Sequence, residues 1–142
     1  MRISLAALMV ATLAACSTST STEVSTTSQN SQTVSQQEVG KAFGMKIGDA
    51  IAVNDLRLTF QRVESDSRCP SDVVCVWAGD GEIALKIEQS GKAAVAALHT
   101  TLEPKKTEWN GYTIQLVSLA PAPKSTAQID PADYRAEILV TR

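Results

Sequence analysis

The sequence has few of the residues on which most catalytic and nucleic-acid-binding sites depend. Of its 142 residues one is a histidine, and aromatic residues make up 4% of the chain. Thirteen basic and fifteen acidic residues give a net charge of −2, which excludes the strongly basic surface typical of a nucleic-acid-binding protein. So few aromatic residues also argue against a platform that stacks single-stranded bases. A lone histidine leaves little scope for histidine-based catalysis or metal binding.

The start of the chain has the pattern of an export signal. Arg2 supplies a positive charge, and a mainly apolar run follows from Ile3 to Leu13. This run is shorter than the ~20 residues of a membrane-spanning helix and fits the apolar part of a signal peptide. It ends in Leu13-Ala14-Ala15-Cys16, which resembles the lipobox of bacterial lipoproteins.

That resemblance implies that residues 1–15 are a lipoprotein signal peptide and that Cys16 becomes the first mature residue. Diacylglyceryl and N-acyl (palmitate) chains on Cys16 would anchor the protein to a membrane of the cell envelope, because two or more chains give stable attachment. Ser17 then resembles the default for the outer membrane, facing the periplasm, if the host is Gram-negative. The alternative is an ordinary secretory signal with an accidental cysteine.

Serine and threonine dominate the segment that follows. They account for 13 of the 19 residues from Ser17 to Ser35, and such a segment cannot bury enough apolar surface to offset the entropy lost on ordering. We therefore expect residues 16–44 to form a lipid-anchored, disordered linker. Residues 45–142 remain for one domain with a modest core.

Alternating hydrophobicity predicts that this domain is all-β. The most regular strand has Ile83, Leu85 and Ile87 on one face, and six further segments with turn signals between them favour strands. These are residues 51–53, 56–60, 73–77, 93–99, 112–119 and 134–141. About seven strands predict a small antiparallel β-sandwich or barrel. The predicted core consists of Leu58, Phe60, Ile83, Leu85, Ile87, Ile114, Leu116, Ile138 and Val140.

Two local features refine this prediction. Val63 breaks the alternation of the strand before it, which indicates a β-bulge near Gln61 or Arg62. Asp130 followed by Pro131 predicts a short helical turn, with the aspartate as its N-cap and the proline at its first position.

The two remaining cysteines, Cys69 and Cys75, are expected to pair with each other. Export places them in a disulfide-permissive compartment, and Cys16 is assigned to lipid. Closing so short a ring would contribute about 2 kcal/mol and would hold a polar excursion against a strand that carries Trp77. The alternative is a redox or metal pair, but the spacing is not Cys-x-x-Cys and no second cluster completes a zinc site.

Several short motifs recur together in this domain. Asp66-Ser67-Arg68-Cys69-Pro70 is followed by Cys75-Val76-Trp77-Ala78-Gly79, and further motifs are Leu98-His99-Thr100, Gly111–Leu116, Pro121-Ala122-Pro123 and Asp133–Ala136. The set resembles an uncharacterised family of bacterial exported proteins and lipoproteins. The resemblance spans residues 56–142 and implies a fold and an exported location, and it carries over no catalytic residue.

Two interpretations remain open for the segment before the disulfide. In the structural one, Asp66 makes an Asx-turn and Arg68 bonds a carboxylate or stacks on Trp77. In the functional one, Asp66, Ser67, Arg68 and Trp77 form a binding loop that contacts a ligand. Trp77 and Trp109 are themselves expected at the core or its rim, because a small β-domain needs large apolar side chains.

The other candidates for chemistry have structural explanations. His99, without a second histidine, is expected to be a hydrogen-bonded structural residue. Asp80 and Glu82 flank Gly81, but the ligand series of an EF-hand is absent, so a solvated turn is expected rather than a calcium site. Asp66, Ser67 and His99 could be drawn as a triad, but no nucleophile elbow or oxyanion-hole motif accompanies them.

These observations favour a non-catalytic binding or structural module of the cell envelope. We expect no enzymatic activity, cofactor or metal. The expected partners are the membrane, through the lipid anchor, and an envelope protein, peptide or glycan, with no nucleic acid. The alternative function is inhibition of an exported hydrolase, because a disulfide-closed loop on a rigid scaffold can enter an active-site cleft at low ordering cost.

Overall fold

The computed structural model describes residues 34–142. These residues form nine β-strands and one short 3₁₀ helix, joined by turns and loops. In chain order they are β1 (Ser35–Gln37), β2 (Ala42–Lys46), β3 (Ala50–Val53), β4 (Leu56–Asp66), β5 (Gly81–Gln89), β6 (Lys92–His99), β7 (Lys106–Trp109), β8 (Tyr112–Ala120), η1 (Pro131–Asp133) and β9 (Arg135–Thr141). The predicted signal peptide, Cys16 and the linker up to residue 33 lie outside the described residues.

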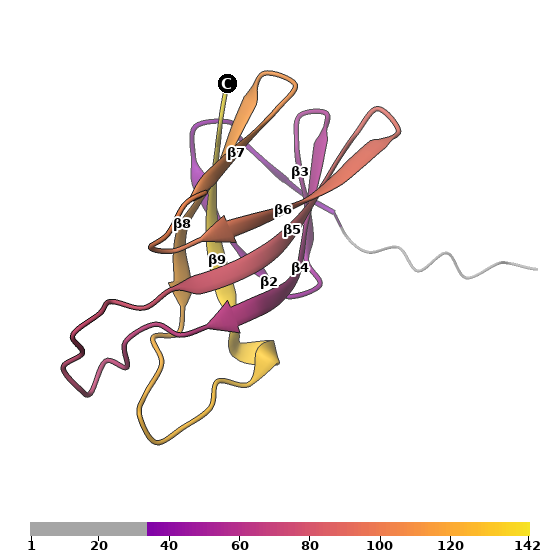
Figure 1. The fold of residues 1–142 in the computed structure, drawn as a ribbon. Coiled ribbons are helices and arrows are strands. Elements are labelled where there is room, and N and C mark those ends of the chain that lie inside the picture. The colour runs from indigo at the N-terminus through magenta and orange to yellow at the C-terminus, as the bar shows by residue number, and fades with distance from the viewer. Residues whose placement is uncertain (1–33) are drawn as a thin grey trace, which may run out of the picture. The chain divides into compact units, whose positions relative to one another are not determined.

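The strands form two sheets, and the fold is a β-sandwich (Figure 1). The five-stranded sheet has the order β1-β3-β4-β5-β6, and the four-stranded sheet has the order β2-β9-β8-β7. Every neighbouring pair is antiparallel except β1 and β3. The all-β sandwich expected from the sequence is therefore confirmed.

The core lies between the two sheets and is built from alternating strand residues. All nine predicted core residues are buried, because successive side chains of a strand point to opposite faces. Met45, Val53, Leu56 and Leu98 are also fully buried. The predicted bulge is present as a register shift between Phe60 and Arg62, where β4 pairs with β5.

Tight turns close one end of the sandwich. The β5–β6 hairpin turns through Ser90 and Gly91, and the β7–β8 hairpin through Asn110 and Gly111; all four residues have positive φ. This is the pattern of type I′ turns, whose twist matches that of paired strands. The 3₁₀ turn is present as predicted, with the Asp130 side chain accepting a hydrogen bond from the Ala132 amide. No helix among residues 34–142 is long and apolar enough to cross a membrane.

Two predictions about strands and boundaries are wrong. Residues 35–37 and 42–44, expected in the linker, lie in β1 and in β2, which continues to Lys46. Phe43 and Met45 of β2 are buried and belong to the core. Residues 73–77, expected as a strand, form an irregular loop. The short strand β7 was not predicted at all, because its four residues show no clear alternation.

Candidate functional site

The connection between β4 and β5, residues 67–80, projects from one end of the sandwich and is here called the disulfide loop (Figure 1). Its base continues the β4–β5 ladder. The Ser67 amide donates to the Asp80 carbonyl over 2.7 Å, and the Cys69 amide donates to the Ala78 carbonyl over 2.8 Å. Gly79 fits this base because it has φ +68° and a Cβ there would lie 1.8 Å from the Ser67 carbonyl oxygen.

A buried ion pair fixes the first side of the base. The Arg68 guanidinium donates to both carboxylate oxygens of Asp66, over 2.7 Å each. It also donates to the carbonyl oxygens of Leu119 and Pro121, where β8 ends. The Tyr134 hydroxyl donates to the same carboxylate over 2.9 Å. These contacts join the end of β4 to the end of β8 and to the start of β9, across the two sheets.

The protonation states at this pair follow from its surroundings. Burial alone would raise the pKa of Asp66, but hydrogen bonds from Arg68 and Tyr134 and the Arg68 charge hold that pKa below its usual value. Burial raises the pKa of Tyr134, and its hydrogen bond to Asp66 raises the pKa further. Near neutral pH Asp66 is therefore a carboxylate and Tyr134 a protonated phenol.

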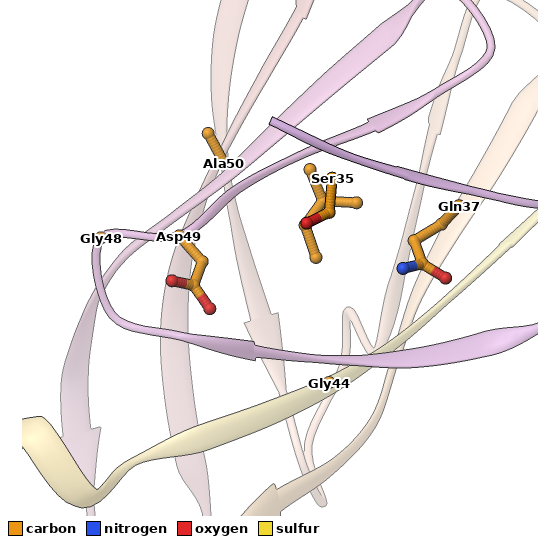
Figure 2. A pocket seen from close by; sticks show the side chains of 7 residues that line it. Ser35, Gln37, Gly44, Gly48, Asp49 and Ala50 are labelled. Atoms are coloured by element: carbon orange, nitrogen blue, oxygen red, sulfur yellow. The ribbon is translucent and has the colours of Figure 1, made fainter. Parts of the chain in front are cut away.

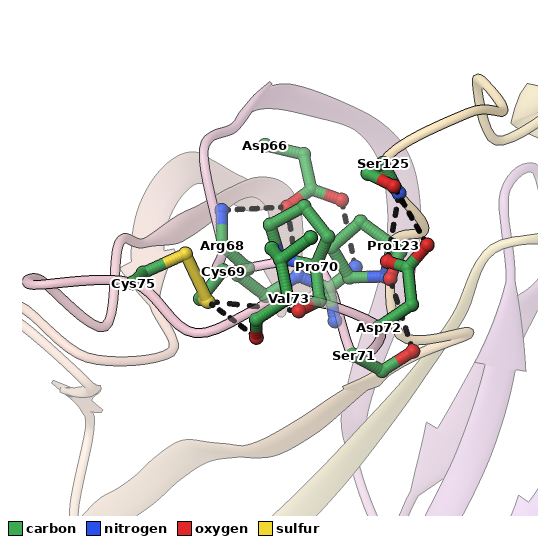
Figure 3. Close-up of a disulfide and its surroundings, with 10 residues drawn as sticks. All are labelled: Asp66, Arg68, Cys69, Pro70, Ser71, Asp72, Val73, Cys75, Pro123 and Ser125. Atoms are coloured by element: carbon green, nitrogen blue, oxygen red, sulfur yellow. Dashed lines mark hydrogen bonds and ion pairs between the residues drawn. A yellow bond between two sulfur atoms is a disulfide. The ribbon is translucent and has the colours of Figure 1, made fainter.

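The second side of the loop is tied to the β8–β9 connection. The Ser71 amide donates to the Pro123 carbonyl over 2.9 Å. The Asp72 carboxylate accepts from the amide and the hydroxyl of Ser125, over 2.9 and 2.7 Å. Figure 3 shows these contacts beside the disulfide. Two segments 53 residues apart in sequence thus support one another.

Cys69 and Cys75 are joined by a disulfide, with their Cα atoms 5.9 Å apart. The bond closes the distal part of the loop into a small ring (Figure 3). A ring this short removes conformational freedom from the unfolded chain and limits the shapes of the folded loop.

The far part of the loop exposes apolar side chains to solvent. Val74 is 101% exposed, Val76 is 90% exposed and Trp77 is 82% exposed, and Val73 is 45% exposed. We call Val73, Val74, Val76 and Trp77 the apolar tip. These four are a majority of the seven exposed large hydrophobic residues between residues 34 and 142. The expectation that Trp77 packs in the core or at its rim is wrong, because no strand carries it back onto a sheet.

Asp80 fastens the base of the loop to the segment after β6. Its carboxylate accepts from His99 Nδ1 over 2.7 Å and from the amides of Thr101 and Leu102. Burial would raise the pKa of Asp80, but these hydrogen bonds outweigh it and lower the pKa to about 2. Asp80 is therefore buried and structural, and the prediction of a solvated turn is wrong for it. His99 is hydrogen-bonded, as expected.

The predicted binding-loop residues separate into two groups. Asp66, Ser67 and Arg68 lie in the base, where their polar side-chain atoms bond to the protein itself, while Trp77 lies in the tip. Sequence reasoning missed Tyr134 and Ser125 as supports of the loop. The role of Tyr134 could have been inferred from its inward position at the start of the last strand. Nothing in the polar connection around Ser125 indicates that this residue supports the loop.

A concavity lies elsewhere, between β1 and the β2–β3 turn (Figure 2). Its volume is about 360 Å³, and the lining residues are Ser35, Gln37, Gly44, Gly48, Asp49, Ala50 and Ile51. Asp49 is its one ionisable side chain and accepts a hydrogen bond from the Lys46 amide over 2.8 Å. No group of three or more His, Cys, Asp or Glu residues placed to hold a metal occurs within residues 34–142.

Comparison with known proteins adds no relative: no family model, no curated protein and no solved structure matches this chain.

Proposed function

We propose that the protein is a non-catalytic binding module of the cell envelope, anchored by lipid at Cys16, which binds an envelope protein through the apolar tip. The observation that carries the proposal is the exposure of Val74, Val76 and Trp77 on a loop whose base is fixed by hydrogen bonds on both sides. Burying such side chains in a partner is favourable by about 25 cal/mol per Å² of apolar surface.

The rigid base supports this role. Asp66 and Arg68 hold one side of the loop, Asp72 holds the other, and the disulfide closes the ring. Because the loop is already ordered, little conformational entropy would be lost when a partner binds it. Tryptophan is also among the residues that contribute most to binding at protein interfaces.

The charges of the loop favour a protein pocket over a lipid surface. Between Cys69 and Gly79 the one charged residue is Asp72. The anionic surface of a bilayer attracts segments rich in lysine and arginine, and the disulfide loop has neither beyond Arg68, which is committed to Asp66. An apolar pocket in a protein accepts valine and tryptophan without this charge requirement.

Photo-crosslinking of the full chain in its own cells tests the binding role. A photoreactive phenylalanine analogue at Val76 is expected to give one discrete adduct. The same analogue at Val117, an exposed valine on β8, is the matched control and is expected to give none. Trp77→Ser is expected to reduce the Val76 adduct at least tenfold. Equal adducts at both positions, or an adduct that Trp77→Ser leaves unchanged, would contradict the proposal.

A fluorescence measurement distinguishes protein from lipid. In a Trp109→Phe background Trp77 is the one tryptophan, and its emission is expected to stay unshifted when anionic phospholipid vesicles are added. A blue shift would assign the tip to the membrane instead. The anchor is tested separately: Cys16→Ser should release the protein from membranes after a salt wash, and retention would refute lipidation.

Inhibition of an exported hydrolase is the second candidate, because Val73 and Val74 lie within a disulfide-closed ring, Val76 and Trp77 directly follow it, and all four protrude in the way that fits a cleft. It predicts that the adduct from Val76 contains a hydrolase. The purified chain should then abolish the activity of that hydrolase at a one-to-one ratio, and Trp77→Ser should restore it.

A further inference from the structure

One edge of the five-stranded sheet differs from the other three edges of the sandwich. The outer strands β1, β2 and β7 have three, five and four residues, and β7 exposes the charged Lys106 and Glu108. Short or charged edges hinder pairing with another chain. The fourth edge strand, β6, has eight residues, and between Lys92 and His99 none of them is charged.

The free side of β6 presents unpaired backbone groups. β5 and β6 pair in one continuous register, from Gln89 opposite Lys92 to Glu82 opposite His99. Beyond this register the Thr100 amide donates to the Gly81 carbonyl. Since backbone groups alternate along an antiparallel strand, those of Ala93, Val95 and Ala97 point away from β5. The His99 amide also points away and donates to the Pro104 carbonyl, so the loop after β6 covers that end, and β7 and β8 of the other sheet also lie close to β6.

The sequence along this edge is the same in both directions. Residues 93–97 read Ala-Ala-Val-Ala-Ala, with Val95 at the centre. In an antiparallel pair of two copies related by a twofold axis at Val95, position 93 faces 97 and Val95 faces its own counterpart. In that register the residues with outward backbone groups face one another, so each can exchange hydrogen bonds with its partner.

The side chains suit this arrangement. Ala93, Val95 and Ala97 lie on the exposed face, and Val95 is 57% exposed. Two Val95 side chains would meet at the axis and cover each other, while small alanines flank them. No like charges oppose one another, because Lys92 would face Leu98 of the second copy.

From this edge we infer that the protein forms a twofold homodimer in which β6 of one copy pairs antiparallel with β6 of another, joining two five-stranded sheets into one. The interaction surface is the β6 edge, and the partner is a second copy of the chain. The inference is independent of the proposed function, because the β6 edge and the apolar tip share no residue.

A pair of charge variants tests the register. In Ala93→Lys with Ala97→Lys, each lysine faces a lysine of the other copy. In Ala93→Lys with Ala97→Glu, each faces an opposite charge, so the second variant is the matched control. Both positions are exposed, and Ala93 pairs with Glu88 on β5, so both variants are expected to keep the fold, as circular dichroism would check.

The readout is the molar mass of the purified full chain in detergent, from light scattering over a range of concentrations. We expect a dimer for the parent, a dissociation constant raised at least tenfold for the lysine–lysine variant, and a dimer for the lysine–glutamate variant. A parent that is monomeric throughout, or a lysine–lysine variant that dimerises like the parent, would overturn the inference.

Proximity is tested with Val95→Cys in intact cells. A short thiol cross-linker is expected to join two copies at this position, and Val117→Cys on the other sheet is expected to give no such product. Cross-linking to a different protein in place of a second copy would also overturn the inference.

Discussion

The two ends of the sandwich use hydrogen-bonded carboxylates for different purposes. At the end formed by the tight turns, here called the turn end, Asp55 accepts from Gln89 over 2.6 Å and from Tyr112 over 2.8 Å. Asn110 donates to Gln89 over 2.7 Å. This network ties together the two-residue turns between β3 and β4, β5 and β6, and β7 and β8, and its members Gln89 and Tyr112 are buried. Every residue in this network helps to hold the turns of this end together.

At the opposite end, here called the loop end, Asp66 performs the corresponding role with Arg68 and Tyr134 (Figure 1). What this network supports is different, because the segment above it ends in Val74 and Trp77, which are exposed. The turn end stabilises the core, whereas the loop end stabilises a surface that contributes little to the core. The comparison indicates that stability and the proposed binding can be altered separately, and the following predictions test this.

The largest effect is expected for Arg68→Ala, which leaves the Asp66 carboxylate buried without its cation. Breaking a buried ion pair from one side costs about 3–5 kcal/mol, and the side chains of Arg68 and Asp66 are 13% and 9% exposed. Leu85→Ala in the core, at about 2–5 kcal/mol, is the reference. Chemical denaturation should give similar losses for both variants. A loss below that of an ordinary surface substitution would show that the ion pair is not part of the architecture.

Glycine substitutions compare the two ends directly. Gly79→Ala should cost ~3 kcal/mol, because positive φ and a clash with the Ser67 carbonyl act together. Gly111→Ala at the turn end has positive φ but open space around the new Cβ, so about 1–2 kcal/mol is expected. Equal losses in thermal unfolding would mean that the loop base rearranges freely.

Acid should weaken the loop end through Asp80. The pKa of Asp80 is about 2 in the folded protein against 3.8 ordinarily, so the unfolded chain takes up its proton first as the pH falls. The stabilisation, ~2 kcal/mol, is therefore complete above about pH 4 and is lost between pH 3.8 and 2. Asp80→Asn should be less stable at neutral pH, and its difference from the parent should shrink across that window. A constant difference would refute this assignment.

Removing one hydroxyl at each end gives a smaller effect. Tyr134→Phe takes a donor from the Asp66 carboxylate, and we expect a loss of about 1.5–3 kcal/mol, as for hydrogen bonds to charged groups. Tyr112→Phe takes a donor from Asp55, which also bonds to Gln89, and we expect about 1 kcal/mol. Denaturant titrations of the two variants should preserve that order.

The smallest effect is expected for Trp77→Ser. A side chain 82% exposed contributes little to the core, so the stability should change by less than ~0.5 kcal/mol. Trp109→Ser at the turn end is the control, because Trp109 packs against the core and its loss should cost about 2 kcal/mol. A large destabilisation by Trp77→Ser would mean that the tip is structural and would remove the support for a binding role.

The sequence predicted best where one local pattern determined the structure. The alternation in β5 fixed which side chains face the core, and Ser90-Gly91 and Asn110-Gly111 specified their turns. Residues 73–77 were misjudged because a run of valines and a tryptophan has strand propensity, whereas the disulfide and the base of the loop hold it away from both sheets. β1 was missed because Ser35–Gln37 are polar and become a strand only by pairing with β3.

At the candidate site, the sequence predicted the disulfide and the importance of the Asp-Ser-Arg segment. It left open whether that segment binds a ligand or supports the loop. The answer depends on Leu119, Pro121 and Tyr134, which are more than 50 residues away. Contacts at such separation follow from strand order and not from local pattern.

The ring closed by Cys69 and Cys75 has a consequence for proteolysis. Exposed loop tips are preferred sites of cleavage, and residues 71–76 are exposed. A protease that cut the chain between the two cysteines would leave both fragments joined by the disulfide. The two fragments would also stay together through the β4–β5 pairing. Cleaved protein would therefore migrate as one intact chain until it was reduced.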